Sequence, residues 1–178
     1  MPREDLEKIF IDHGFGDFKW LNPSSVVISQ WVRVKCLFGC PDYDVNATCP
    51  PNGLSLPESE RFFREYENIA VFHFAEKMDQ PEDRHDWTEG ISRQLIEMER
   101  RIFLSGYRKV FLLPPDNCHY CKKCVDVRGD CKHPKIARPS PESLGMDVFA
   151  TVRSIGYPID VLSDYDEVMN RYAFLLIE

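Results

Sequence analysis

Four cysteines between Cys118 and Cys131 constrain this chain more than any other feature. Cys118, Cys121 and Cys124 follow one another at steps of three residues, and Cys131 comes seven residues later. One tight loop of this kind can direct three thiolates at three irons of a cubane, and Cys131 can bind the fourth iron. Zinc sites usually pair two separated Cys-x-x-Cys motifs, whereas the two motifs here share Cys121. The spacing therefore favours a [4Fe–4S] cluster over zinc, and either metal over disulfides.

A second set of cysteines lies earlier in the chain. Cys36, Cys40 and Cys49 stand in a segment rich in Pro, Asn, Asp and Gly. Three thiolates can hold a further cubane and leave one iron open to water, substrate or another ligand. Two alternatives remain open: a structural zinc completed by a histidine or an aspartate, and buried thiols without metal. Tyr43 lies inside this group, and we expect it to bind at the cofactor and shield it from water.

The residues beside the second group suggest how a cluster would be stabilised. His133 is a candidate cofactor-binding residue that either donates to a cluster sulfur or caps the turn. His119 is expected to be exposed rather than to coordinate the metal. Cations near the loop would stabilise a negatively charged cluster or dock an acidic redox partner protein, although a solvated loop explains them equally well. These cations are Lys122, Lys123, Arg128, Lys132, Lys135 and Arg138.

Composition limits the classes of protein and partner. The chain has 178 residues, 43 % of them hydrophobic, which suits one domain spanning residues 1–178. Its net charge of −7 argues against nucleic acid as a partner. No apolar run is long enough to span a bilayer, and the N-terminus is charged rather than an apolar signal. We therefore expect a cytoplasmic protein without a membrane partner, in which cysteines serve as metal ligands.

Helical and β-prone segments alternate along the chain. Such alternation predicts an α/β domain with a mainly parallel or mixed sheet, flanked by helices. The expected helices cover residues 3–12, 55–68, 140–156 and a segment from a capping box at Asp86 to Gly106. The expected strands cover 26–29, 31–35, 69–75, 110–113, 159–162 and 173–177.

The predicted strands suggest where the two cysteine groups lie. Cys36 directly follows the expected strand 31–35, and Cys118 follows the expected strand 110–113. In parallel sheets, ligands gather beyond the carboxyl ends of the strands. If these strands are parallel, both metal-binding loops share one rim of the sheet and are close enough to exchange electrons.

Two motifs around the cysteines carry a family resemblance. The first is Lys35-Cys36-x-x-Gly39-Cys40-x-x-Tyr43 with Thr48-Cys49-Pro50-Pro51. The second is the Cys118 group with Cys131-x-His133-Pro134, Ala137-Arg138-Pro139-Ser140 and Glu142-x-Leu144-Gly145-Met146-Asp147-Val148. From about residue 31 to 159 the chain resembles a bacterial and archaeal family of predicted cysteine-rich metal-binding proteins. The resemblance implies metal binding without a defined reaction. Asp44 departs from the pattern, which has glycine after the tyrosine.

These observations lead to one functional expectation and two rivals. We expect an iron–sulfur protein for redox chemistry and electron transfer, with one [4Fe–4S] cluster at the second group and a second metal centre at the first. One rival is an enzyme that uses an open iron of the three-cysteine centre on a small substrate, such as one containing sulfur. The other is a structural zinc-binding module. The chain contains no phosphate-binding loop, dinucleotide fingerprint or nucleophile elbow.

Overall fold

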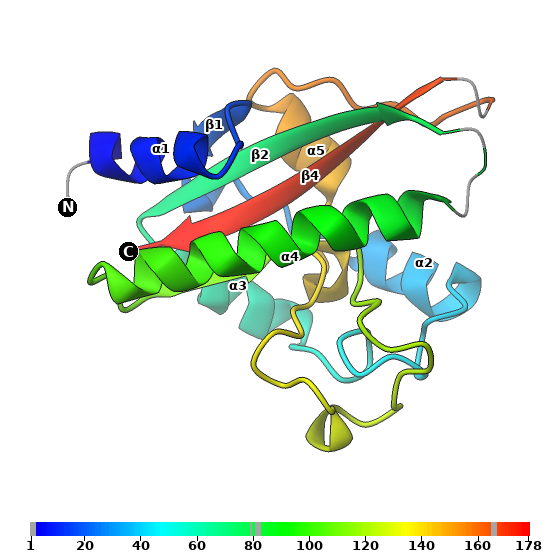
Figure 1. The fold of residues 1–178 in the computed structure, drawn as a ribbon. Coiled ribbons are helices and arrows are strands. Elements are labelled where there is room, and N and C mark those ends of the chain that lie inside the picture. The colour runs from blue at the N-terminus through cyan, green and yellow to red at the C-terminus, as the bar shows by residue number, and fades with distance from the viewer. Residues whose placement is uncertain (1–2, 79, 81–82, 165–166) are drawn as a thin grey trace.

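A four-stranded sheet forms the centre of the protein (Figure 1). The structure is a computed structural model that describes residues 3–78, 80, 83–164 and 167–178. The strands are β1 (Phe18–Leu21), β2 (Asn68–Lys77), β3 (Val110–Leu113) and β4 (Val168–Ile177), in the spatial order β1-β2-β4-β3. All neighbouring strands are antiparallel. The α/β class is confirmed, but the prediction of a mainly parallel or mixed sheet is wrong.

The position of β4 explains this error. β2, the long helix α4 (Asp83–Leu104) and β3 form a crossover unit, which normally joins parallel strands. β2 and β3 are indeed parallel to each other, because both are antiparallel to β4. β4 inserts between them and gives a split βαβ arrangement. Local sequence patterns predict the crossover but not a strand that enters it from later in the chain.

Helices cover both faces of the sheet (Figure 1). α1 (Arg3–Asp12) and α4 pack on one face, against Ala70 and Phe72 of β2. α3 (Leu56–Arg64) and α5 (Val148–Arg153) pack on the other, against Ile69 and Val71. The alternation along β2 follows from the two-residue period of a strand, and it places two apolar cores back to back.

Helix α2 (Gln30–Gly39) replaces the strand expected over 31–35. Residues 26–29 form no strand either, and contain only an isolated β-bridge between Ile28 and Met146. Only Val32 of this helix is buried, and its other large apolar residues are exposed: Trp31, Val34, Leu37 and Phe38. The β-branched and aromatic residues of this short segment suggested strands, because such residues are common in strands. Contacts outside the helix hold it, including a hydrogen bond from Trp31 Nε1 to Asp147 Oδ2 at 3.1 Å.

Some of the other expected elements are confirmed, and others are wrong. The helix over 3–12 and the strands corresponding to β2, β3 and β4 are confirmed, whereas β1 was missed. The described residues 159–162 form no strand. α4 begins at Asp83, so Asp86 lies inside the helix and caps nothing, and α3 ends at Arg64 rather than near residue 68.

The helix expected over 140–156 is broken in two. A 3-10 turn at Glu142–Leu144 precedes α5, whose N-cap Asp147 accepts a hydrogen bond from the amide of Ala150. Gly145 separates them with a φ of 80°, and a Cβ there would lie 2.2 Å from Leu56. This turn places Glu142 and Ser143 beside the first cysteine group. In the described part of the chain, no helix has the length and apolar character needed to cross a membrane.

Candidate metal centres

The first cysteine group begins at the C-terminal end of α2. Cys36 lies in the last turn of this helix and Cys40 is its C-cap, with an amide that donates to the Cys36 carbonyl at 3.3 Å. Residues four apart lie on one side of a helix. The Cys-x-x-x-Cys spacing therefore directs both thiols to the same side. The expectation that Cys36 follows a strand is wrong, because a helix end brings these thiols together.

Cys49 reaches the first group from the loop after α2. This residue is buried, with 6 % of its surface exposed. Burial, followed by the negative charge of Asp42, raises the pKa of its thiol to about 12, and Cys40 and Cys36 add to the rise. Burial also raises the pKa of Cys36, with Cys40 as the next cause. Such thiols keep their protons until a bound cation compensates the negative charge.

The backbone of this loop is held by its own polar groups. The buried Asn46 accepts hydrogen bonds from the amide and the hydroxyl of Thr48, each at 3.0 Å. Asp44 has a φ of 60°, and its amide donates to the carbonyl of Pro50 at 2.9 Å. This left-handed conformation favours glycine, the residue that the family pattern has at this position, but Asp adopts it more readily than most residues. The turn around the first group is thus kept without the glycine.

The second cysteine group lies in the loop that leaves β3. Cys118, Cys121, Cys124 and Cys131 are all half-buried free thiols. Burial is the main cause of a raised pKa at Cys118, and the other three thiols contribute to it, while a hydrogen bond from the main chain of Tyr120 opposes the rise. The other three thiols therefore lie near enough to Cys118 for their charge to act on it. That the four thiols bind one metal centre stays a prediction.

A buried ion pair fixes the end of the second loop. Arg138 Nη2 lies 2.9 Å from Glu99 Oε2, and the side chains are 18 % and 6 % exposed. Glu99 Oε1 also accepts the amide of Leu112 in β3 at 3.0 Å. The carboxylate thus joins α4, β3 and the loop. Arg138 was expected to be a cation near the cluster, but its partner is this carboxylate.

The two cysteine groups lie side by side. Figure 1 shows both loops below α4, and hydrogen bonds join them. Asn46 Nδ2 donates to the carbonyl of Cys118 at 3.0 Å, and the amide of Ala47 donates to Cys124 Sγ at 3.4 Å. Asn52 Nδ2 donates to the carbonyl of Asp126 at 2.6 Å. The proximity expected from a shared sheet rim is present, although it arises from contacts between loops.

The spacing of the thiols bears on the metal they could hold. All seven cysteines lie in the described part of the chain, and all are free. Across the described residues, ligand atoms of three metal-binding side chains come within 4.8 Å of one another only at His85, Asp116 and His119. A single zinc with bonds of about 2.3 Å would need its thiolates roughly 3.8 Å apart. A cubane would instead bind each thiolate to a different iron.

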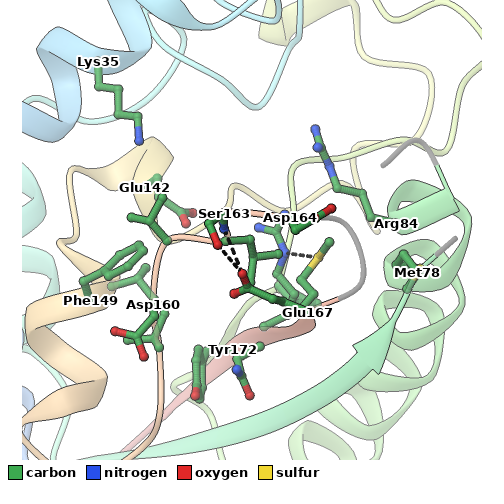
Figure 2. A pocket seen from close by; sticks show the side chains of 18 residues that line it. Lys35, Met78, Arg84, Glu142, Phe149, Asp160, Ser163, Asp164, Glu167 and Tyr172 are labelled. Atoms are coloured by element: carbon green, nitrogen blue, oxygen red, sulfur yellow. Dashed lines mark hydrogen bonds between the residues drawn. The ribbon is translucent and has the colours of Figure 1, made fainter. Parts of the chain in front are cut away.

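Two neighbouring cavities lie at or near the first group. One, of about 150 Å³, is lined by Cys36, Cys40 and Cys49. The other, of about 510 Å³, shares Glu142 and Arg171 with it. Figure 2 shows the larger cavity, with the carboxyl group of Glu142 and the amine of Lys35 directed into it. Glu142 and Arg171 therefore form a wall that the two cavities share.

Glu142 is the titratable group at the junction of these cavities. Part of its surface faces the cavity space, yet protein surrounds it closely enough that burial raises the pKa of its carboxyl. The positive charge of Arg171 opposes this rise, and the negative charge of Asp116 adds to it. Glu142 therefore keeps its proton to a higher pH than an exposed glutamic acid. Sequence reasoning placed Glu142 in a motif but assigned it no role.

The remaining predicted site residues occupy different surroundings. Tyr43 lines the 150 Å³ cavity with the three cysteines of the first group. His133 is exposed, and its carbonyl accepts the amides of Ile136 at 3.1 Å and Ala137 at 3.0 Å. Cofactor contact by Tyr43 and His133 stays a prediction. His119 is half-buried, so the expectation that it is exposed is wrong.

Comparison with protein families decides what kind of protein this is. The family described as predicted metal-binding protein (DUF2284) matches residues 19–177. The chain belongs to this family. No curated protein and no solved structure gives a significant match. Metal binding is thus supported by the family, by the seven free thiols and by the nearby histidine and aspartate group.

Proposed function

We propose that this protein is an iron–sulfur protein that transfers electrons. Cys118, Cys121, Cys124 and Cys131 would hold a [4Fe–4S] cluster, and the first group would hold a second metal centre. The observation that carries this proposal is the hydrogen bond from the Ala47 amide to Cys124 Sγ. Hydrogen bonds to ligand sulfurs are one means by which proteins set the reduction potential of a cluster.

The same hydrogen bond gives a short path between the two centres. Ala47 lies two residues before Cys49, so one piece of backbone carries a ligand of the first group and contacts a ligand of the second. Asn46 adds a second connection, to the carbonyl of Cys118. A bound cluster would supply one-electron chemistry. The protein would supply the ligands, the donors to sulfur and the separation from solvent.

Exposed cations support a redox partner protein. Lys122, Lys123, Lys132 and Lys135 are all exposed around the second group. Opposite charges on two proteins speed their encounter. An acidic partner would therefore meet the protein on the side where the four-cysteine centre lies, and its electron-transfer rate would fall as salt is added.

Metal analysis of protein purified without oxygen tests this proposal. We expect brown protein with broad absorption near 400 nm and about eight irons per chain if both groups hold cubanes. About four irons would assign a cubane to one group, and the Cys124→Ala variant would identify which. Colourless protein with two zinc ions would contradict the proposal and support a structural zinc-binding module.

The cavities favour a second candidate function, an enzyme acting at the first group. Three thiolates would leave an iron of a bound cubane without a protein ligand. The 510 Å³ cavity could admit a small substrate, such as one containing sulfur, and Glu142 could supply a proton at the junction. Activity that is lost in Cys49→Ser while the signal of the second cluster remains would support the enzyme. Electron transfer that survives in this variant would support a carrier.

A further inference from the structure

His85, Asp116 and His119 form a third group of metal-binding side chains. His85 lies in the first turn of α4. Asp116 lies between β3 and the second cysteine group, and His119 lies within that group, between Cys118 and Cys121. One ligand atom from each side chain lies within 4.8 Å of the other two. The two imidazole rings are 4.2 Å apart between centroids. Two elements distant in the sequence thus bring two nitrogen donors and one oxygen donor together.

The hydrogen bonds around His119 leave one of its nitrogens free to bind a metal. Asn117 Nδ2 donates to Asp42 Oδ2 at 3.0 Å, which turns Asn117 Oδ1 toward His119. His119 Nε2 lies 2.8 Å from this oxygen and must carry the proton to donate. Nδ1 then has a lone pair. Metal-binding histidines usually donate their other N–H to an oxygen in this way, because the bond fixes the ring and its tautomer.

His85 and Asp116 face each other without a satisfactory hydrogen bond. His85 Nδ1 lies 3.2 Å from Asp116 Oδ2, but it is buried and has no properly oriented hydrogen-bond partner among the described residues. Asp116 is held by other contacts, since its Oδ1 accepts the amide of Asn117 at 2.9 Å and its Oδ2 lies 3.4 Å from the hydroxyl of Thr88. A buried nitrogen without a partner costs free energy, and a cation between the two side chains would remove that cost.

We propose that His85, Asp116 and His119 bind one divalent cation of the zinc or ferrous iron class. Imidazole with carboxylate is a donor set that these ions prefer, whereas the thiol groups suit softer chemistry. Three protein ligands leave at least one position for water or substrate. Asp116 and Asn117 also line the 150 Å³ cavity of the first cysteine group. This third site therefore borders that cavity, and it adds to the two cysteine centres rather than replacing either one.

Zinc uptake by the complete, anaerobically purified protein tests this site. The protein would be dialysed against micromolar Zn²⁺ with its cysteine-bound metal in place, and zinc, iron and sulfide would be counted together. We expect the wild type to hold one more zinc per chain than His119→Ala or Asp116→Asn. Asp126→Asn is the matched control, because this exposed carboxylate lies in the same loop but outside the group, and the variant should hold as much zinc as the wild type.

A measurement on the wild type covers the case in which a variant fails to fold. The imidazole ¹⁵N resonances of His85 and His119 should shift when Zn²⁺ is added, with Nδ1 of His119 unprotonated beforehand. Equal zinc in the wild type and His119→Ala, or resonances that zinc does not move, would overturn the site and leave an ion pair between His85 and Asp116. A wild-type protein purified without iron and sulfide would instead count against the cysteine clusters. The two proposals can therefore fail separately.

Discussion

The two cysteine groups are held in place by different means. In the first group, a helix end positions Cys36 and Cys40, and a loop ordered by Asn46 buries Cys49. The second group occupies a long irregular loop with exposed lysines, fixed at its end by Arg138. A site shaped by protein contacts can exist before metal arrives, whereas a loop with little apolar content gains its order from the ions it binds. We therefore expect the first site to exist before metal binds and the second to depend on metal for its order.

Removing one ligand from each group should reveal the difference between the two groups most strongly. Cys124→Ala should lose about four irons and the order of residues 114–140, since the cluster would hold that loop. Cys49→Ser should lose the metal of the first group but keep the structure of residues 40–55. Iron counts and hydrogen exchange on both variants measure the difference, with the exposed Lys123→Ala as control. Full iron in Cys124→Ala would refute the cluster assignment.

The anchor of the second loop gives the next largest effect. Arg138→Met keeps the length of the side chain but leaves the buried carboxylate of Glu99 unpaired. The free energy of unfolding should fall by about 3–5 kcal/mol, because breaking a buried ion pair leaves one buried charge without a partner. Asp160→Asn removes an exposed partner of Arg153 and should cost about 1 kcal/mol or less. Urea unfolding of both variants checks this, and equal losses would show that the Glu99 pair is not an anchor.

Metal binding at the first group should strengthen as pH rises. The thiol of Cys49, with a pKa of about 12 in the metal-free protein, is protonated at pH 7–9 and must lose its proton on binding. Each such proton changes the affinity roughly tenfold per pH unit. Calorimetric titration with Cd²⁺ in buffers of different ionisation enthalpy counts the protons released. Cys49→Ser should release about one proton fewer, and an unchanged count would mean that Cys49 is not a ligand.

The turn at Asp44 gives the smallest effect. Asp44→Gly should be more stable than Asp44→Ala by about 1 kcal/mol, because glycine accepts the left-handed backbone and alanine does not. The wild type should lie between the two variants. Thermal unfolding under identical conditions measures the order. Equal stability of the glycine and alanine variants would show that this turn relaxes and does not help to shape the first group.

Sequence patterns predict the parts of this protein that depend on neighbours in the chain. The periods of α1, β2 and β3 are visible because each buries one face or the whole segment. The spacing of Cys118, Cys121 and Cys124 likewise carries its own chemistry. α2 was not predicted, because it buries few side chains and depends on contacts with residues distant in the sequence, such as that of Trp31 with Asp147.

Two features of the candidate sites could not be predicted because the residues are far apart in the sequence. No spacing rule connects His85 to Asp116 and His119, which meet only because α4 packs against β3. The contact between Ala47 and Cys124 likewise depends on how two irregular loops meet. The residue type does not show which backbone amide donates to a sulfur, since every residue except proline has an N–H group.

The central place of β4 has a consequence for biosynthesis. β2 and β3 flank this strand, and both cysteine segments precede it in the chain. While the ribosome is still making residues 168–177, neither β2 nor β3 has the partner that joins them, so the frame under both loops is incomplete. The seven thiols therefore emerge before their scaffold closes, and ions delivered at that moment would meet a nascent chain whose ligands are not yet arranged. Maturation of this protein is expected to follow translation.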